Sequence, residues 1–350
     1  MQTRIPRIAA ASAFTLTLGI SLTACSADST SSNTVNEDAE LRVTASTQVW
    51  ADIADTVVED TDQVDITAII SGNNTDPHSY EPTARDMALV EQSDIVVLGG
   101  GHYDAWLASA AAETDALVIS ALDVDETDHE DHDHSHEDEH AHDHDHAHDG
   151  EVNEHVWYDT EALETVGSEL TDAVNERLGD GSASMSTLES DLEEIREKKA
   201  TLDAGTVVQA HPVADYILEG TALEEITPEG YRSATLAEAE PSAADVNAML
   251  EIIESGDADY FIYAPQTSDQ VSARLLDAAT ANGLRVIDVF ESPSEEQSFI
   301  DLYLSTLDQF SVNPDAGNST GSDSTESPVD DESEGDSDLL NTPEPTATDE

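Results

Sequence analysis

Residues 64–70 read Val-Asp-Ile-Thr-Ala-Ile-Ile, a run that alternates at first and then becomes entirely apolar. Such a run is typical of a strand that enters a sheet covered on both faces. Turn-forming residues follow at 71–74 (Ser-Gly-Asn-Asn), and a second short buried strand at 94–98 precedes three glycines at 99–101. Buried strands that are separated by turn signals and helical patterns indicate βαβ units and a mostly parallel sheet.

The same alternation of strands and helices restarts after residue 204. Strands are expected at 41–48, 64–70, 94–98, 116–120, 206–208, 260–263 and 285–287, and helices at 49–61, 82–92, 103–112, 160–178, 184–203, 212–219, 242–255, 267–282 and 297–310. The helix at 184–203 lies between the two groups of βα units, and its apolar residues recur at nearly helical spacing. We therefore expect an α/β fold of two lobes, each a mostly parallel β-sheet flanked by helices, with one long rigid helix linking the lobes.

Shifts in composition suggest where the domains begin and end. The expected divisions are a lipoprotein signal peptide (1–24), a flexible stalk (25–40), an N-terminal lobe (41–182) with a disordered His/Asp-rich loop (123–151), a linking helix (183–203), a C-terminal lobe (204–310) and an acidic disordered tail (311–350). The loop and the tail contain too few large apolar residues to form a core.

The 350-residue chain is strongly acidic, with 78 Asp and Glu against 11 Lys and Arg and a formal net charge of -67. This balance argues against nucleic acid as a partner and against docking on an anionic membrane, because both require clustered basic residues. Cations are the natural ligands of such a surface. Hydrophobic residues make up 38% of the sequence, which is enough to bury a core.

The N-terminus has the layout of a secretory signal peptide. Arg4 and Arg7 precede an apolar run at 8–22, which is too short for a comfortable membrane span. The run ends in Leu-Thr-Ala-Cys (22–25), which resembles a bacterial lipobox, in which Cys25 would carry the lipid. An ordinary signal peptide with an incidental cysteine is the alternative. Cys25 is the single Cys of the chain, which excludes an intramolecular disulfide. We expect an extracytoplasmic protein that is lipid-anchored to the bacterial cell membrane.

Three of the 13 histidines lie in distinctive surroundings. His78 and His211 each follow an expected strand, one in each lobe, and His155 lies between the lobes' patterns in Asn-Glu-His-Val-Trp. Open α/β sheets bind ligands beyond the carboxyl ends of their strands. Three imidazoles with one oxygen ligand would form a four-coordinate zinc site. Taken singly, each histidine could equally be a hydrogen-bonded structural residue.

The segments around these histidines resemble the metal-ligand motifs of the zinc- and manganese-binding lipoproteins of bacterial ABC importers, the ZnuA/TroA-like family. Asp-Pro-His-Ser-Tyr-Glu-Pro-Thr (76–83) resembles the first motif, and Asn-Glu-His-Val-Trp (153–157) resembles the second, with Glu154 in place of the family's Pro. Ala-His-Pro-Val-Ala-Asp-Tyr (210–216) resembles the third. The segments 263–268 and 283–287 resemble those that lead to the fourth ligand. The likeness covers about residues 41–310.

The resemblance implies two α/β lobes with the metal in the cleft between them. It also implies capture of the ion outside the membrane and delivery to an ABC permease. By position, His78, His155 and His211 would be metal ligands. The family places a carboxylate soon after the last strand, and we favour Glu291 with Asp288 in reserve, because that strand should continue through Phe290 and deliver the next residue to the cleft. His102 and Tyr103 are expected near the site without binding the metal.

The expected cargo is Zn²⁺ rather than Mn²⁺. The relatives that favour manganese can carry a carboxylate at the third ligand position, where this chain has His211. More imidazole makes a softer site and favours zinc, which also binds nitrogen-containing sites more tightly than Mn²⁺.

Residues 128–149 consist almost entirely of alternating His, Asp and Glu. A weak, multi-site zinc collector at the mouth of the cleft is the functional interpretation, and a solvated, unselective tether is the alternative. The histidines concerned are His129, His132, His134, His136, His140, His142, His144, His146 and His148.

Two other functions compete with a metal carrier, which we expect to be a monomer. Three histidines and a bound water would suit a zinc hydrolase, but the sequence has no His-Glu-x-x-His run, and a fourth protein ligand would close the site. We therefore expect no enzymatic activity. A surface adhesion protein is the other alternative, since the acidic tail could serve an interaction.

Overall fold

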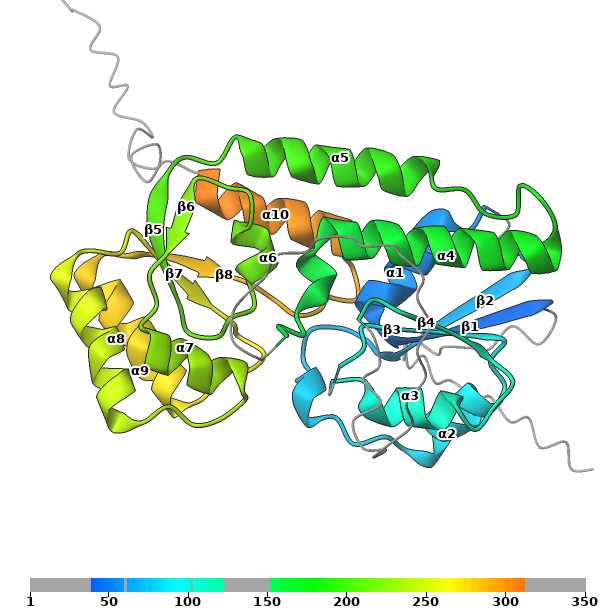
Figure 1. Ribbon diagram of the computed structural model, residues 1–350, viewed down its shortest axis with the longest axis horizontal. Helices are drawn as coiled ribbons and strands as arrows, with labels where there is room; N and C mark the ends of the chain where they lie inside the picture. The colour runs from blue at the N-terminus through cyan, green and yellow to red at the C-terminus, as the bar shows by residue number, and fades with distance from the viewer. Residues whose placement is uncertain (1–38, 60–61, 102, 123–151, 312–350) are drawn as a thin grey trace, which may run out of the picture.

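The computed structural model describes residues 39–59, 62–101, 103–122 and 152–311, which form two α/β lobes side by side (Figure 1). The expected signal peptide and His/Asp-rich loop, and nearly all of the expected stalk and acidic tail, lie outside the described residues. Within the described part of the chain, no helix combines the length and the apolar character needed to cross a bilayer.

The first lobe is built on four parallel strands in the order β2-β1-β3-β4. They are β1 (Leu41–Thr47), β2 (Val64–Ile70), β3 (Ile95–Leu98) and β4 (Leu117–Ser120). Alternate residues of β3 enter different cores, because successive side chains of a strand point to opposite faces. Ile95 and Val97 belong to the large central core, whereas Val96 and Leu98 pack with α2 (Ala84–Glu91) and α3 (Ala105–Ala111). Both faces of this sheet are therefore covered, as the apolar strand sequences predict.

The second lobe repeats this topology with strands in the order β6-β5-β7-β8, again all parallel. They are β5 (Gly205–Gln209), β6 (Leu223–Glu225), β7 (Tyr260–Tyr263) and β8 (Arg285–Asp288). Val207 and Ile262 face the central core, whereas Val208 and Phe261 face a separate core on the outer side. The central core contains residues of both sheets, so it joins the lobes.

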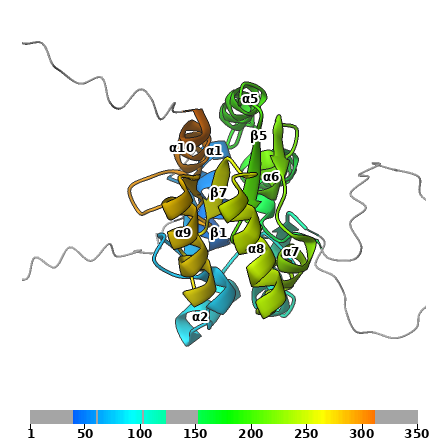
Figure 2. The same cartoon turned by 90° about the vertical axis from the view of Figure 1, so that its left-hand side faces the viewer.

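The outer side of the second sheet is covered by α7 (Glu229–Leu236), α8 (Ala243–Ser255) and α9 (Gln270–Asn282). Figure 2 shows α8 and α9 side by side on this lobe, and the two helices are in contact. The central core is closed by other helices. They are α1 (Gln48–Val57), α4 (Thr160–Leu178), α6 (Asp215–Leu218) and α10 (Phe299–Ser311), with the 3-10 turn η2 (Val156–Tyr158). A second 3-10 turn, η1 (Pro77–Ser79), follows β2.

The chain passes from one lobe to the other through α5 (Ser186–Ala200), which runs along both lobes in Figure 1. Its buried residues Leu188, Leu192 and Ile195 recur at helical spacing and pack into the central core. The helix is shorter than the expected 184–203, and Leu202 is buried just beyond its end.

Three local features differ from the sequence-based expectations. Strand β6 and helix α7 were not expected, because β6 has three residues and Tyr231 is the one buried residue of α7, so neither shows a clear period. Strand β8 ends at Asp288 and does not continue through Phe290 as expected. The backbone of Val289 still donates to Tyr263 (2.9 Å), but the carbonyl of Phe290 accepts from the Tyr158 hydroxyl (2.6 Å), which draws the chain away from the sheet.

Candidate metal centre

The structure brings four side chains from four separate segments to one point between the lobes. They are His78, His155, His211 and Glu291, and one potential ligand atom from each lies within 4.8 Å of the others. His78 lies on η1 beyond β2, and His155 directly precedes η2. His211 and Glu291 follow β5 and β8 in the second lobe. Because the strands of each sheet are parallel, their carboxyl ends meet at the same edge and deliver these residues together.

His78 is oriented by a short capped turn. Asp76 caps η1 by accepting the backbone N–H of His78 (2.9 Å), and Pro77 begins the turn with a fixed backbone angle. The ring of Tyr103 stacks edge-on against that of His78, with centroids 5.0 Å apart. The Nε2 atom of His78 lies 3.3 Å from Glu291 Oε2, and its Nδ1 atom contacts Glu238.

His155 is buried and held through its other ring nitrogen. Its Nδ1 lies 2.6 Å from the amide oxygen of Asn153, which also accepts the backbone N–H of His155 (3.0 Å). This contact fixes the ring so that Nε2 faces the centre of the site. The Nε2 atoms of His155 and His211 approach to 3.0 Å.

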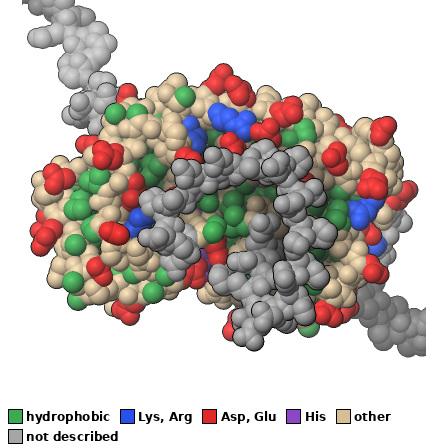
Figure 3. All heavy atoms as spheres, viewed as in Figure 1, with side chains coloured by type: hydrophobic (Ala, Val, Ile, Leu, Met, Phe, Trp, Pro, Cys, Tyr) green, Lys and Arg blue, Asp and Glu red, His purple; other side chains and the backbone are tan. Residues whose placement is uncertain are grey.

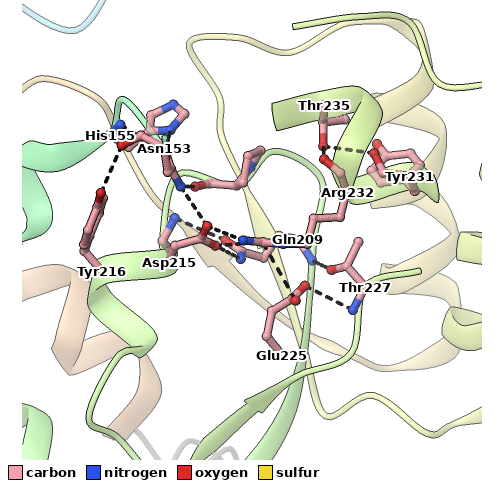
Figure 4. A network of polar contacts seen from close by, with 12 residues as sticks. Asn153, His155, Gln209, Asp215, Tyr216, Glu225, Thr227, Tyr231, Arg232 and Thr235 are labelled. Carbon is pink, nitrogen blue, oxygen red and sulfur yellow. Dashed lines mark hydrogen bonds and ion pairs between the residues drawn. The ribbon is translucent and has the colours of Figure 1, made fainter. Parts of the chain in front are cut away.

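Asn153 is in turn fixed by a polar network that surrounds Asp215 (Figure 4). Asp215 accepts hydrogen bonds from Asn153 (2.7 Å) and Gln209 (2.7 Å), and both guanidinium nitrogens of Arg232 pair with it (2.9 and 2.5 Å). A two-pronged Arg–carboxylate pair has defined geometry. Tyr216 donates to the backbone oxygen of Asn153 (3.0 Å). The network therefore connects the His155 segment of the first lobe to the His211 segment of the second.

Glu291 is 1% exposed, although it is a carboxylate. Its backbone N–H donates to Gln266 (2.7 Å), which also donates to Ser292 (3.0 Å) and so fixes this loop. Among the described residues, neither carboxylate oxygen accepts a well-formed hydrogen bond. An acid that is buried in this way requires a positive partner. The three imidazoles and the space between them are where such a partner would lie.

The pKa values of the three histidines shift in different directions. Burial lowers the pKa of His78, but the contacts with the carboxylates of Glu238 and Glu291 outweigh that effect and raise the pKa to about 10, so His78 must release a proton when it binds a metal. Burial lowers the pKa of His155 well below its usual value, and the neighbouring His211 and His78 lower it further. Burial also lowers the pKa of His211. His155 and His211 are thus held neutral, the form in which imidazole binds a metal.

The donor set suits a divalent transition metal. Three imidazole nitrogens and one carboxylate offer four potential donor atoms of the kinds that bind such ions. The orphaned oxygens of Glu291 and the His78 Nε2 atom, which also lacks a well-formed hydrogen bond among the described residues, point to an ion at this position. Metal-binding histidines usually have a hydrogen-bond partner on their second ring nitrogen. Here Glu238 contacts that nitrogen of His78, and Asn153 contacts that of His155.

Of the other residues predicted for the site, one lies beside it, one lies away from it, and the rest lie outside the described residues. Tyr103 lies against His78, and its buried hydroxyl has no hydrogen-bond partner among the described residues. Asp288 is exposed and is not among the four clustered residues; its backbone pairs with Gln309 instead. His102, Cys25 and the nine histidines of the His/Asp-rich loop lie outside the described residues. Sequence reasoning missed Glu238, and it missed the Asp215–Arg232 pair, which no local spacing signals.

Comparison with known proteins finds the same architecture. The family described as "ZnuA: Zinc-uptake complex component A periplasmic" matches residues 43–312. The zinc-binding lipoprotein AdcA of Streptococcus pneumoniae (strain ATCC BAA-255 / R6) is 22% identical over 290 residues, which cover 76% of this chain and 53% of AdcA. The chain therefore spans about half the length of this curated relative.

Solved structures agree in fold. The periplasmic zinc binding protein TroA from Treponema pallidum superposes with a TM-score of 0.58 at 17% identity, covering 78% of this chain and 98% of TroA. A mutant, manganese-bound periplasmic metal binding protein from Candidatus Liberibacter asiaticus gives a TM-score of 0.56 at 16% identity, covering 77% and 97% of the two chains. At these identities the likeness shows a shared fold; the first of these proteins is named as zinc-binding, and the second was solved with manganese bound.

Proposed function

The chain belongs to the ZnuA family of periplasmic zinc-uptake components, and from this premise we propose that it captures Zn²⁺ outside the cytoplasm and delivers it to the permease of an ABC importer. The observation that carries the proposal is the convergence of His78, His155, His211 and Glu291 on one point between the lobes. In this account the ion is the cargo, and the four side chains are its ligands.

The choice of zinc rests on the ligands. Three imidazoles and one carboxylate form a softer set than the oxygen-rich sites that suit manganese. Zinc also binds such mixed nitrogen and oxygen sites more tightly than manganese does. The name of the relative AdcA, a zinc-binding lipoprotein, is consistent with this choice.

A carrier explains the site better than an enzyme does, and the family is one of transport components. Catalytic zinc sites keep a position open for water or substrate, whereas structural or carrier sites are closed by protein ligands. Here the fourth position is supplied by Glu291, which is buried against His78. Metal-bound water is therefore excluded from the proposed coordination sphere.

Two further parts of the proposal concern residues outside the described structure. Cys25 would carry a lipid that anchors the protein to the outer face of the membrane, with residues 26–40 as a tether. The nine histidines between His129 and His148 would collect zinc weakly near the site. Metabolic labelling with a fatty acid tests the anchor, because a Cys25→Ala variant should lose the label.

Uptake of radioactive zinc tests the function as a whole. Cells that lack the protein should take up zinc slowly from zinc-poor medium, and the wild-type chain should restore uptake. A chain with His155→Ala should not restore it, although it is made and exported at the same level. Equal restoration by the variant and by the wild type would overturn the proposed function.

A further inference from the structure

One contact at the site crosses between the lobes outside the four proposed ligands. The carboxylate of Glu238 contacts the Nδ1 atom of His78, while the Nε2 atom of the same ring faces Glu291. His78 belongs to η1 of the first lobe, and Glu238 follows α7 of the second. The His78 side chain is 11% exposed and that of Glu238 is 52% exposed, so the contact lies at the edge of the site.

The backbone at Glu238 is unusual for its residue type. Its φ of 52° makes it the one non-glycine residue in the left-handed region among the described residues. The backbone N–H of Glu238 donates to Thr235 (3.2 Å), and that of Ala239 donates to Ala234 (2.8 Å). These two bonds form a Schellman motif at the end of α7, in which the left-handed position is usually occupied by glycine. Glutamate is unfavourable at this position, which suggests that its side chain has a role elsewhere.

The contact at Nδ1 matters because an imidazole that binds a metal is neutral, with one N–H and one lone pair. When a carboxylate accepts a hydrogen bond from Nδ1–H, the lone pair is on Nε2, the atom that faces the other proposed ligands. Asn153 has the equivalent position at His155, where its amide oxygen lies 2.6 Å from Nδ1. Partners of this kind orient metal-binding histidines and raise their basicity.

We propose that Glu238 is a positioning residue for the metal site, which orients His78 from the opposite lobe and thereby raises the affinity for the bound ion. This inference rests on the proposed function, since it assumes that His78 is a metal ligand. Glu238 itself does not bind the metal in this account. Because the contact joins the two lobes directly at a ligand, its loss also speeds dissociation of the ion.

A glycine substitution within the Schellman motif separates an effect on metal binding from an effect on stability. Glu238→Gly removes the carboxylate but places the preferred residue at the left-handed position. The metal-free variant should therefore melt at the wild-type temperature or a few degrees higher. Its zinc dissociation constant, measured by competition with a tight chelator, should rise tenfold to a hundredfold. The chelator also keeps zinc off the weaker sites of the chain.

Two other variants and one spectroscopic signal complete the test. Glu238→Gln keeps a hydrogen-bond acceptor and should lose less than tenfold in affinity, whereas Glu240→Gln, an exposed glutamate on the same loop, should bind like the wild type. In the zinc-bound protein labelled with ¹⁵N-histidine, the Nδ1 proton of His78 should exchange with water faster in Glu238→Gly than in the wild type.

The outcomes distinguish this inference from the proposed function. If Glu238→Gly binds zinc within twofold of the wild type, or loses affinity only together with thermal stability, Glu238 has no positioning role. The proposed function still stands in that case if His211→Ala abolishes tight binding. A wild-type chain without a tight zinc site would overturn both.

Discussion

The Nε2 atoms of His155 and His211 lie 3.0 Å apart, although 56 positions separate the two residues in the sequence. Their rings are nearly perpendicular, with centroids 4.7 Å apart. Burial lowers the pKa of both residues, so both imidazoles are neutral near neutral pH and can direct lone pairs into the site. The two lobes thus meet at a pair of metal-competent nitrogens.

Replacing either histidine by alanine should remove one proposed ligand, and His155→Ala also removes a ring contact with the core residue Trp157. We expect His155→Ala and His211→Ala each to weaken zinc binding by about a hundredfold or more, because closed sites use all four ligands. The unfolding midpoint without metal should change little in His211→Ala and fall more in His155→Ala, which loses a buried ring. Calorimetric titration with zinc measures the first effect and thermal unfolding the second. Unchanged affinity in both variants would contradict the site.

Glu291 should affect both metal binding and the metal-free fold, because it pairs with His78. The two side chains lie 3.3 Å apart and Glu291 helps to raise the pKa of His78, so Glu291→Gln removes one charge of a buried pair at nearly constant volume. We expect the metal-free variant to lose about 1–3 kcal/mol in the free energy of unfolding, and zinc binding to weaken at least tenfold. Denaturant unfolding and zinc titration measure the two effects.

Asp288→Asn is the matched control for Glu291. It removes a carboxylate of the same strand end that is exposed and lies outside the cluster. Its zinc affinity should equal that of the wild type. A large loss in Asp288→Asn together with no loss in Glu291→Gln would make Asp288 the fourth ligand.

Asp215 should matter for both folding and binding because it holds Arg232, Asn153 and Gln209 together. Asp215→Ala leaves the half-buried guanidinium of Arg232 without this partner and frees Asn153 to turn. We expect a loss of about 2 kcal/mol in the free energy of unfolding and about tenfold in zinc affinity. Glu164→Ala breaks the exposed pair with Arg196 and should lose less than about 1 kcal/mol, with no effect on affinity. Equal effects of the two variants would show that the network does not support the site.

The raised pKa of Asp104 predicts that the free energy of unfolding depends on pH. Burial raises the pKa of Asp104 to about 7, although hydrogen bonds from Gly99, Ser46 and Gly100 act in the opposite direction. Because the folded-state pKa lies above the unfolded value of 3.8, the folded protein retains a proton that the unfolded chain releases. The stabilising contribution of this proton is complete below about pH 4 and is lost as the pH rises to about 7.

The difference between the wild type and Asp104→Asn isolates this effect. Other carboxylates titrate alike in both proteins, so they cancel in the difference. Relative to the variant, the wild type should lose stability between about pH 4 and pH 7, by about 1.4 kcal/mol for each unit of pKa shift. Denaturant unfolding of the metal-free proteins at several pH values gives the comparison. Parallel curves would show that Asp104 titrates normally in the folded state.

Acidic side chains are spread over the surface of both lobes, with few Lys and Arg among them (Figure 3). The four proposed ligands contribute little to the net charge of -67. In our proposal the surface charge attracts cations of all kinds, and the buried cluster selects among them by its position and donor atoms.

Strand periodicity predicted most of the fold, and strand ends predicted the positions of His78 and His211, whereas His155 was predicted from the resemblance of its motif to the family. Buried parallel strands such as β2 and β3 have a strong local signal, and their carboxyl ends point to the same edge. Strand β6 contains only Leu223 as a buried residue, and α7 contains only Tyr231, so neither has a detectable period. Glu238 lies in a left-handed position where glycine is expected, and its contact with His78 arises only when the lobes come together.

A competition titration of Zn²⁺ against Mn²⁺ on the chain without residues 128–149 tests the central claim most directly. Removing that segment eliminates the nine clustered histidines and leaves the proposed site between the lobes intact. We predict one tightly bound zinc per chain, not displaced by a large excess of manganese, and loss of this binding in His211→Ala. Disappearance of tight zinc binding together with the deleted segment, or preferential binding of manganese, would contradict the account.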